Sequence, residues 1–169
     1  MRKDLPQSEL RTDTGMDEFS MTSPAIPTAV AEVLAQHAEH IRTRLVQVRD
    51  LIYVVAAETE GVGPLTETLK WGEPASLTQA SRAGTTIRLG VAKSAPERCA
   101  VFFNCRTTLI ETFRIHFADD FTFEGNRAIL IPASGDLPRE PLALCLQAAL
   151  TYHRRAAMLP RTWPKTSTN

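Results

Sequence analysis

The sequence predicts an α+β fold of two layers, in which a mainly antiparallel sheet of about five short strands is packed by N-terminal and C-terminal helices. Two observations lead to this class. Apolar residues recur with the period of a helix near the start and the end of the chain, and they alternate with period two in the middle. Helices that are separated in sequence from a run of consecutive strands are typical of α+β domains.

Length and composition fit one globular domain. The chain has 169 residues, of which 43% are hydrophobic and 22% are charged, so it can bury a core without a metal or a disulfide. Basic and acidic residues number 19 each, and this balance lacks the basic excess typical of nucleic-acid binding. No apolar run reaches the ~18–20 residues of a membrane helix. The three cysteines lack zinc-like spacing. We therefore expect a cytoplasmic protein with no cofactor, no nucleic-acid partner and no membrane contact.

Three segments are expected along the chain. Residues 1–26 are polar and interrupted by prolines, which predicts a disordered leader. Residues 27–158 form the domain. Residues 159–169 hold two prolines and end in Thr-Ser-Thr-Asn, which predicts a disordered tail.

The domain should begin with two helices, a short one near residues 28–37 and a long one to about residue 60. An apolar stripe with spacings of three and four marks the long helix: Ile41, Leu45, Val48, Ile52 and Val55. Arginines at positions 42, 44 and 49 occupy much of the remaining circumference. The run Gly-Val-Gly-Pro at 61–64 ends this pattern, and residues 65–70 are expected to add one or two helical turns.

Strands should follow. Residues 85–92 alternate as a half-buried strand that Pro96 is expected to break. Residues 99–105 are apolar on both faces, which predicts a central strand with Cys105 on its inward face. Thr108 and Glu111 have the spacing of a capping box and predict a short helix.

The end of the domain is predicted as a hairpin and a closing helix. A two-residue turn at Gly125-Asn126 would join strands 121–124 and 127–131. That turn would set Glu124 opposite Arg127, and it would place Phe121, Phe123, Ala128 and Leu130 on one face. The final helix opens near residue 137, and its apolar face comprises Leu142, Cys145, Leu146, Ala149 and Tyr152.

The run Lys70-Trp71-Gly72-Glu73-Pro74 marks the change from helical to strand period. Gly72 can take a left-handed conformation that ends a helix, and Pro74 prevents the helix from continuing. On this structural interpretation Trp71 buries its ring. On the alternative, functional interpretation Trp71 and Glu73 form the lip of a ligand pocket beside the sheet, and Arg88 completes the predicted binding residues.

These elements resemble the YdhG-like family, catalogued as domain of unknown function 1801. The resemblance covers roughly residues 30–155 and depends on the Trp-Gly-x-Pro motif. Weaker matches lie at Arg49-Asp50-Leu51, Val101-Phe102-Phe103, Gly125 to Ile129 and Leu137-Pro138. It implies the same fold. Some members have been likened to frataxin and proposed as intracellular iron chaperones, which implies an acidic surface for hard cations. Here arginines interrupt the acidic residues of the long helix.

Other chemical candidates are weaker. His37 and His40 are one helical turn apart, but His116 and His153 are distant in sequence, so we expect no metal site. Cys99, Cys105 and Cys145 fall at apolar positions, which favours buried, inert thiols. A triad of Cys105, His116 and Asp119 or Asp120 is an alternative that only geometry can test, and no catalytic residue is predicted.

The sequence therefore favours a bacterial-type cytoplasmic binding module, non-catalytic rather than an enzyme, that recognises a small ligand or a protein. The first alternative is a frataxin-like protein that handles iron or another metal. The second is an enzyme that uses Cys105 or His116. Self-association through a free sheet edge is compatible with each of these.

Overall fold

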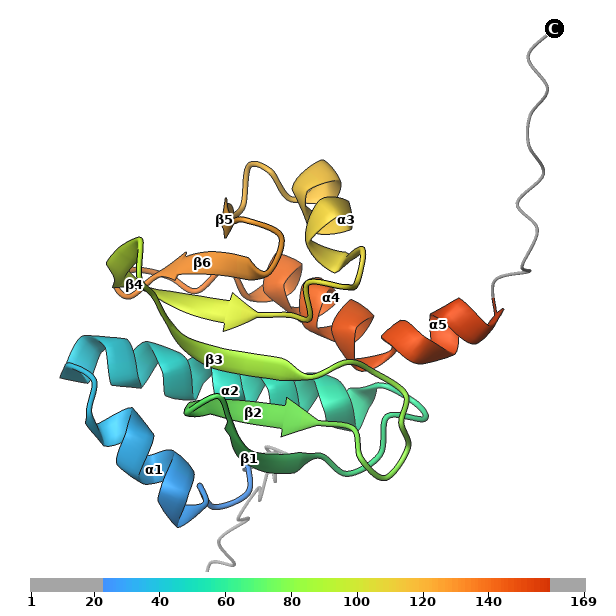
Figure 1. Ribbon diagram of the computed structural model, residues 1–169, viewed down its shortest axis with the longest axis horizontal. Helices are drawn as coiled ribbons and strands as arrows, with labels where there is room; N and C mark the ends of the chain where they lie inside the picture. Colours follow the sequence, from blue (N-terminus) through green and yellow to red (C-terminus); the bar gives the residue numbers. More distant parts are fainter. Residues whose placement is uncertain (1–22, 159–169) are drawn as a thin grey trace, which may run out of the picture.

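The computed structural model describes residues 23–158 and confirms the predicted α+β class (Figure 1). Five helices and six strands occur in these residues. In chain order they are α1 (Thr28–Ala35), α2 (Glu39–Glu58), β1 (Thr66–Lys70), β2 (Glu73–Leu77), β3 (Ile87–Ala92), β4 (Ala95–Phe102), α3 (Leu109–His116), β5 (Thr122–Glu124), β6 (Ala128–Pro132), α4 (Arg139–Leu150) and α5 (Tyr152–Met158). Residues 1–22 of the expected leader and the expected tail from residue 159 lie outside the described residues. Residues 23–26, which were expected to belong to the leader, are described, and Ile26 packs against the core.

The strands form one sheet in the order β1-β2-β3-β4-β6-β5, and every neighbouring pair is antiparallel. Helices α2 and α4 pack side by side against one face of this sheet (Figure 1). The opposite face, which we call the outer face, carries a smaller apolar cluster of Ala92, Ala100, Phe102, Ala128 and Leu130. Strands β1 and β5 lie at the two edges.

The main core lies between the helices and the sheet. The whole predicted apolar stripe of α2 is buried there, and so are Leu142, Cys145, Leu146 and Ala149 of the predicted face of α4. From the sheet, Cys99 and Val101 of β4 and Ile129 and Ile131 of β6 face these helices. Alternation along each strand sends the intervening residues to the outer face.

The prediction of extra helical turns at residues 65–70 is wrong, because this segment is strand β1. Lys70 pairs with Glu73 and Thr66 pairs with Leu77 along a continuous antiparallel ladder. A six-residue segment after Gly-Val-Gly-Pro has too few turns for a stable helix, whereas a neighbouring strand satisfies its backbone at once. The sheet therefore has six strands in the described residues, and not about five.

Strand β4 is central, as predicted, but its limits differ from the prediction. Pro96 does not break a strand, because it lies at the start of β4, where the register with β3 shifts and its missing N–H costs no ladder bond. The strand ends at Phe102, so Cys105 lies in the following loop and is exposed. Its predicted inward position is therefore wrong.

The β5–β6 hairpin forms with a loop one residue longer than predicted. Glu124 pairs with Ala128, so Arg127 is a loop residue and does not face Glu124. This shift of the register by one residue changes which side chains share a face of the hairpin. The prediction placed Phe123 on one face with Leu130, whereas in the structure Phe123 pairs with Ile129. The predicted capping box is also absent, because the side chain of Thr108 makes no cap hydrogen bond, although helix α3 forms.

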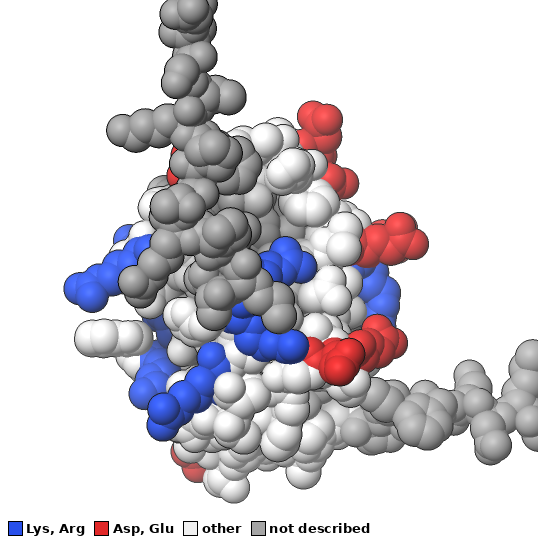
Figure 2. All heavy atoms as spheres, turned by 90° about the vertical axis from the view of Figure 1, so that its right-hand side faces the viewer, with Lys and Arg blue, Asp and Glu red and all other residues white. Residues whose placement is uncertain are grey.

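The charged residues are distributed unevenly despite the zero net charge. Figure 2 views the end of the molecule that lies on the right in Figure 1. On this face most of the basic side chains lie at the left and centre of the picture, and most of the acidic ones lie toward its right margin. Among the described residues, no helix has both the length and the apolar character needed to cross a membrane.

Candidate functional site

The Trp-Gly motif is the tip of the β1–β2 hairpin. Lys70 and Glu73 are the last paired residues, and Trp71 and Gly72 form a two-residue loop with φ of 57° and 77°. Positive φ at both loop residues is the requirement of a type I′ turn, whose twist matches that of the strands. Gly72 is left-handed, as predicted, but it closes a hairpin and does not end a helix.

Trp71 is 91% exposed, so the expectation that it buries its ring is wrong. A residue at the tip of a two-residue turn lies beyond the last strand pair, where the core cannot reach it. Asn, Asp or Gly usually occupies the first position of this turn, because positive φ is strained for a bulky side chain. An exposed aromatic ring in a strained position contributes little to folding, and such features cluster at binding sites.

The hairpin tip borders a cavity of about 430 Å³. The structure brings two of the three predicted site residues, Trp71 and Arg88, to this cavity. Its complete lining is Lys70, Trp71, Leu77, Thr86, Arg88, Phe103, Asn104, Cys105 and Arg127. Four of these, Phe103, Asn104, Cys105 and Arg127, follow strand β4 or precede β6, so the cavity joins loops that are distant in sequence.

The third predicted residue, Glu73, does not line the cavity but holds Arg88. Its carboxylate lies 2.5 Å from Nη1 of Arg88, whose guanidinium also lies 5.3 Å from the centre of the Phe102 ring. Gly90 lies beside this pair, and a Cβ there would lie 3.4 Å from Oε1 of Glu73 and from the Phe102 ring, which is ordinary van der Waals contact. Burial raises the pKa of Glu73 above its usual range, and Arg88 and Arg127 offset part of that rise.

Three hydrogen bonds, one between backbone groups and two between a side chain and the backbone, fix the far side of the cavity. The amide of Phe103 donates to the carbonyl of Arg127 at 2.7 Å. Asn126 donates from Nδ2 to the carbonyl of Cys105 at 3.3 Å. Asn104 forms a tight turn by accepting the amide of Arg106 at 3.0 Å. These contacts place Arg127 and Cys105 beside Arg88.

The sequence prediction missed Lys70, Arg127 and Cys105 as lining residues. For the two basic residues the sequence showed only that each stands beside a predicted turn. The strand order is needed to see which of these turns lie next to one another in the fold.

The cavity is electropositive. Lys70, Arg88 and Arg127 line it, and within residues 23–158 only Arg88 of these three has a carboxylate within ion-pair distance. Cationic side chains beside an aromatic ring are suited to a small molecule that carries negative charge and a flat face.

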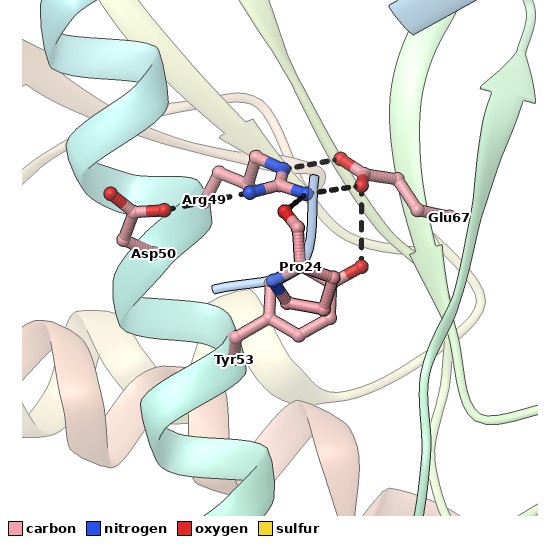
Figure 3. A network of polar contacts seen from close by, with 5 residues as sticks. All are labelled: Pro24, Arg49, Asp50, Tyr53 and Glu67. Carbon is pink, nitrogen blue, oxygen red and sulfur yellow. Dashed lines mark hydrogen bonds and ion pairs between the residues drawn. The ribbon is translucent and has the colours of Figure 1, made fainter. Parts of the chain in front are cut away.

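A buried ion pair holds the hairpin strand to helix α2 (Figure 3). Arg49, 3% exposed, donates from Nε and Nη2 to the two oxygens of Glu67 on β1, both at 2.7 Å. The same Nη2 donates to the carbonyl of Pro24 at 2.8 Å, and the guanidinium lies 4.8 Å from the centre of the Tyr53 ring. The hydrogen bond to Glu67 raises the pKa of Arg49 further, and burial raises the pKa of Tyr53. This network joins the segment before α1 to α2 and β1.

The cysteines differ in exposure. Cys99 and Cys145 are buried, as predicted, and burial raises their pKa values to about 11 and about 12. Cys105 is exposed, which contradicts the prediction that all three are buried.

The residues of the alternative catalytic and metal sites are spread over the described part of the chain. Across residues 23–158, no hydrogen bond joins Cys105, His116, Asp119 or Asp120 to another of the four. His116 lies against Phe117, with ring centres 6.4 Å apart. The same residues contain no group of three or more His, Cys, Asp or Glu side chains that could hold a metal ion.

The fold and cavity define a two-layer α+β protein with an electropositive pocket at one end of its sheet. This architecture is similar to the crystal structure of a protein from the DUF1801 family, YdhG of Bacillus subtilis. The two share a TM-score of 0.50 and 19% sequence identity over 81% of this chain and 98% of that chain. The resemblance found in the sequence is thus confirmed at the level of the fold. No family model matches the sequence, and no curated protein does.

Proposed function

We propose that this protein is a non-catalytic module that binds a small anionic molecule between the Trp71 hairpin tip and the Asn104-Cys105 loop. The observation that carries the proposal is the convergence of Lys70, Arg88 and Arg127 with an exposed Trp71 on one cavity of about 430 Å³. A cavity of this size fits a small metabolite.

The lining favours a ligand with two parts. A carboxylate or phosphate group would accept hydrogen bonds from Arg88 and Arg127, because guanidinium donors match the geometry of these groups. A flat ring would stack on Trp71, whose side chain is already exposed and needs no partner displaced. Glu73 holds Arg88 by an ion pair, so the ligand meets a pre-positioned donor.

A thermal-shift screen of the full-length protein tests this proposal. The screen uses small carboxylates and phosphates with flat rings, each beside a neutral analogue of the same shape. A true ligand raises Tm, and the stabilisation grows with the logarithm of its concentration, to about 2.7 kcal/mol at 100 times its Kd. The effect must weaken in Arg127→Met and persist in Arg155→Met, which removes an exposed charge on helix α5.

The outcome that overturns the proposal is equally definite. Neutral analogues that stabilise the protein as well as anions, or anions that act equally on Arg127→Met, would place binding elsewhere. A protein partner whose binding is lost on changing Trp71, with no small ligand found, would favour a docking surface instead.

We also propose a cytoplasmic location, which the three unpaired cysteines support. No feature of residues 23–158 favours metal handling or an enzyme based on Cys105 or His116 over ligand binding.

A further inference from the structure

Two arginines of helix α2 are equally buried but have very different partners. Arg49 is 3% exposed and is matched by Glu67, Asp50 and the carbonyl of Pro24. Arg44, five residues earlier, is 4% exposed and donates one hydrogen bond, to the carbonyl of Gly135. Its Nε has no partner, and no carboxylate of residues 23–158 lies within ion-pair distance of it.

A buried guanidinium without a counter-charge is costly. Burial removes the hydration of the charge, and only a partner anion or several hydrogen bonds can offset that loss. A guanidinium also keeps its positive charge inside a protein. The positive charge of Arg44 also acts on the neighbouring thiol of Cys99. It lowers the pKa of Cys99, although burial raises that pKa by more. Among residues 23–158 the site therefore lacks the negative charge that would offset the burial of Arg44.

Arg44 lies in the wall of a cavity of about 530 Å³ where such a charge can enter. The cavity lies between the first turns of α2 and the loop after β6. Its lining is Glu39, His40, Thr43, Arg44, Gln47, Ala133, Ser134 and Gly135. Thr43, Gln47 and Ser134 offer hydroxyl and amide donors, and the N-terminal turns of a helix favour anions. The one acidic side chain, Glu39, is exposed, so solvent screens its repulsion.

We propose that Arg44 anchors a second binding site, which takes a small molecule through an oxyanion group such as phosphate, sulfate or carboxylate. The unused donors of the guanidinium match two oxygens of such a group. The cavity is larger than a bare phosphate, so the natural ligand carries a further body. None of its lining residues lines the Trp71 cavity, and the two sites are independent.

Titration of the full-length protein with inorganic phosphate, sulfate or acetate tests this site, with sodium chloride of equal ionic strength as the reference. The Nε–H resonance of Arg44 should shift in a saturable way with at least one oxyanion and stay fixed with chloride. In Arg44→Met, whose apolar side chain suits a buried position, the affinity for that oxyanion should fall by about tenfold or more. Arg155→Met, which changes helix α5 and no residue of this cavity, should bind like the wild type.

A second variant keeps the test decisive even if Arg44→Met folds poorly. Ser134→Asp places a carboxylate on the cavity wall, where it can pair with Arg44. We expect this variant to show a higher Tm without added anion and a lost response to phosphate. The proposal is overturned if no oxyanion shifts the Arg44 resonance, if Arg44→Met responds like the wild type, or if Ser134→Asp retains the full response.

Discussion

Replacing Arg49 by methionine should destabilise the protein strongly, because it leaves a buried carboxylate without its partner. The side chain of Glu67 is 5% exposed and receives two hydrogen bonds from Arg49, and its other bonded partner is the hydroxyl of Tyr53 at 3.2 Å. Breaking a buried pair from one side costs about 3–5 kcal/mol. For a chain of this size that corresponds to a fall in Tm of about 6–20 °C.

Urea unfolding of four proteins measures this effect as a double-mutant cycle. They are the wild type, Arg49→Met, Glu67→Met and the variant that carries both changes. Each single change should lower the free energy of unfolding by about 3–5 kcal/mol, whereas the double change should cost much less than their sum, because no unpaired charge remains. The reasoning is refuted if the single changes cost less than about 1 kcal/mol or if the two costs simply add.

Three further predictions concern the motif and the thiols. Trp71→Asn, which places the preferred residue in the type I′ turn, should raise stability by up to about 1 kcal/mol and weaken ligand binding roughly tenfold, as unfolding and calorimetry can show. Because the pKa of Glu73 is raised, its protonation begins above the usual range. The affinity for an anion of constant charge should therefore rise on acidification, and Glu73→Gln, which can still accept a hydrogen bond from Arg88 but carries no charge, should bind more tightly at neutral pH without this dependence. For Cys145 the folded-state pKa of about 12 lies above the unfolded value near 9. Only the unfolded chain then loses this proton as pH rises between them, so stability falls by about 1.4 kcal/mol per pH unit. Cys145→Ala should make the alkaline loss of stability shallower by that amount, and an equal slope would contradict the assignment.

Local periodicity was sufficient to predict the layers of the fold. The stripe of α2 and the face of α4 follow from the spacing of apolar residues, since a helix buries one side whatever it packs against. The period-two run of β3 has the same local origin. In contrast, residues 65–70 carry no strong period, and their strand depends on pairing with β2, which the local sequence does not show.

The candidate site was predicted only in part, for the same reason. Glu73 and Arg88 lie on the neighbouring strands β2 and β3, and Trp71 lies in the turn just before β2, so the pairing of these strands brings the three residues together. Arg127 reaches the cavity because the β5–β6 loop has three residues, a length fixed by register and not by the Gly-Asn pair. The contrast between Arg44 and Arg49 is likewise invisible in sequence, because both occupy buried positions of one helix and differ only in what faces them.

The central claim is that the cavity beside Trp71 binds a small anion, and the fluorescence of Trp71 tests it most directly. The chain has two tryptophans, so Trp163→Phe leaves Trp71 as the single reporter. Titration of this variant with an anion that raises Tm should change the Trp71 emission along the same saturation curve that calorimetry gives. Calorimetric binding with unchanged Trp71 emission would contradict the claim.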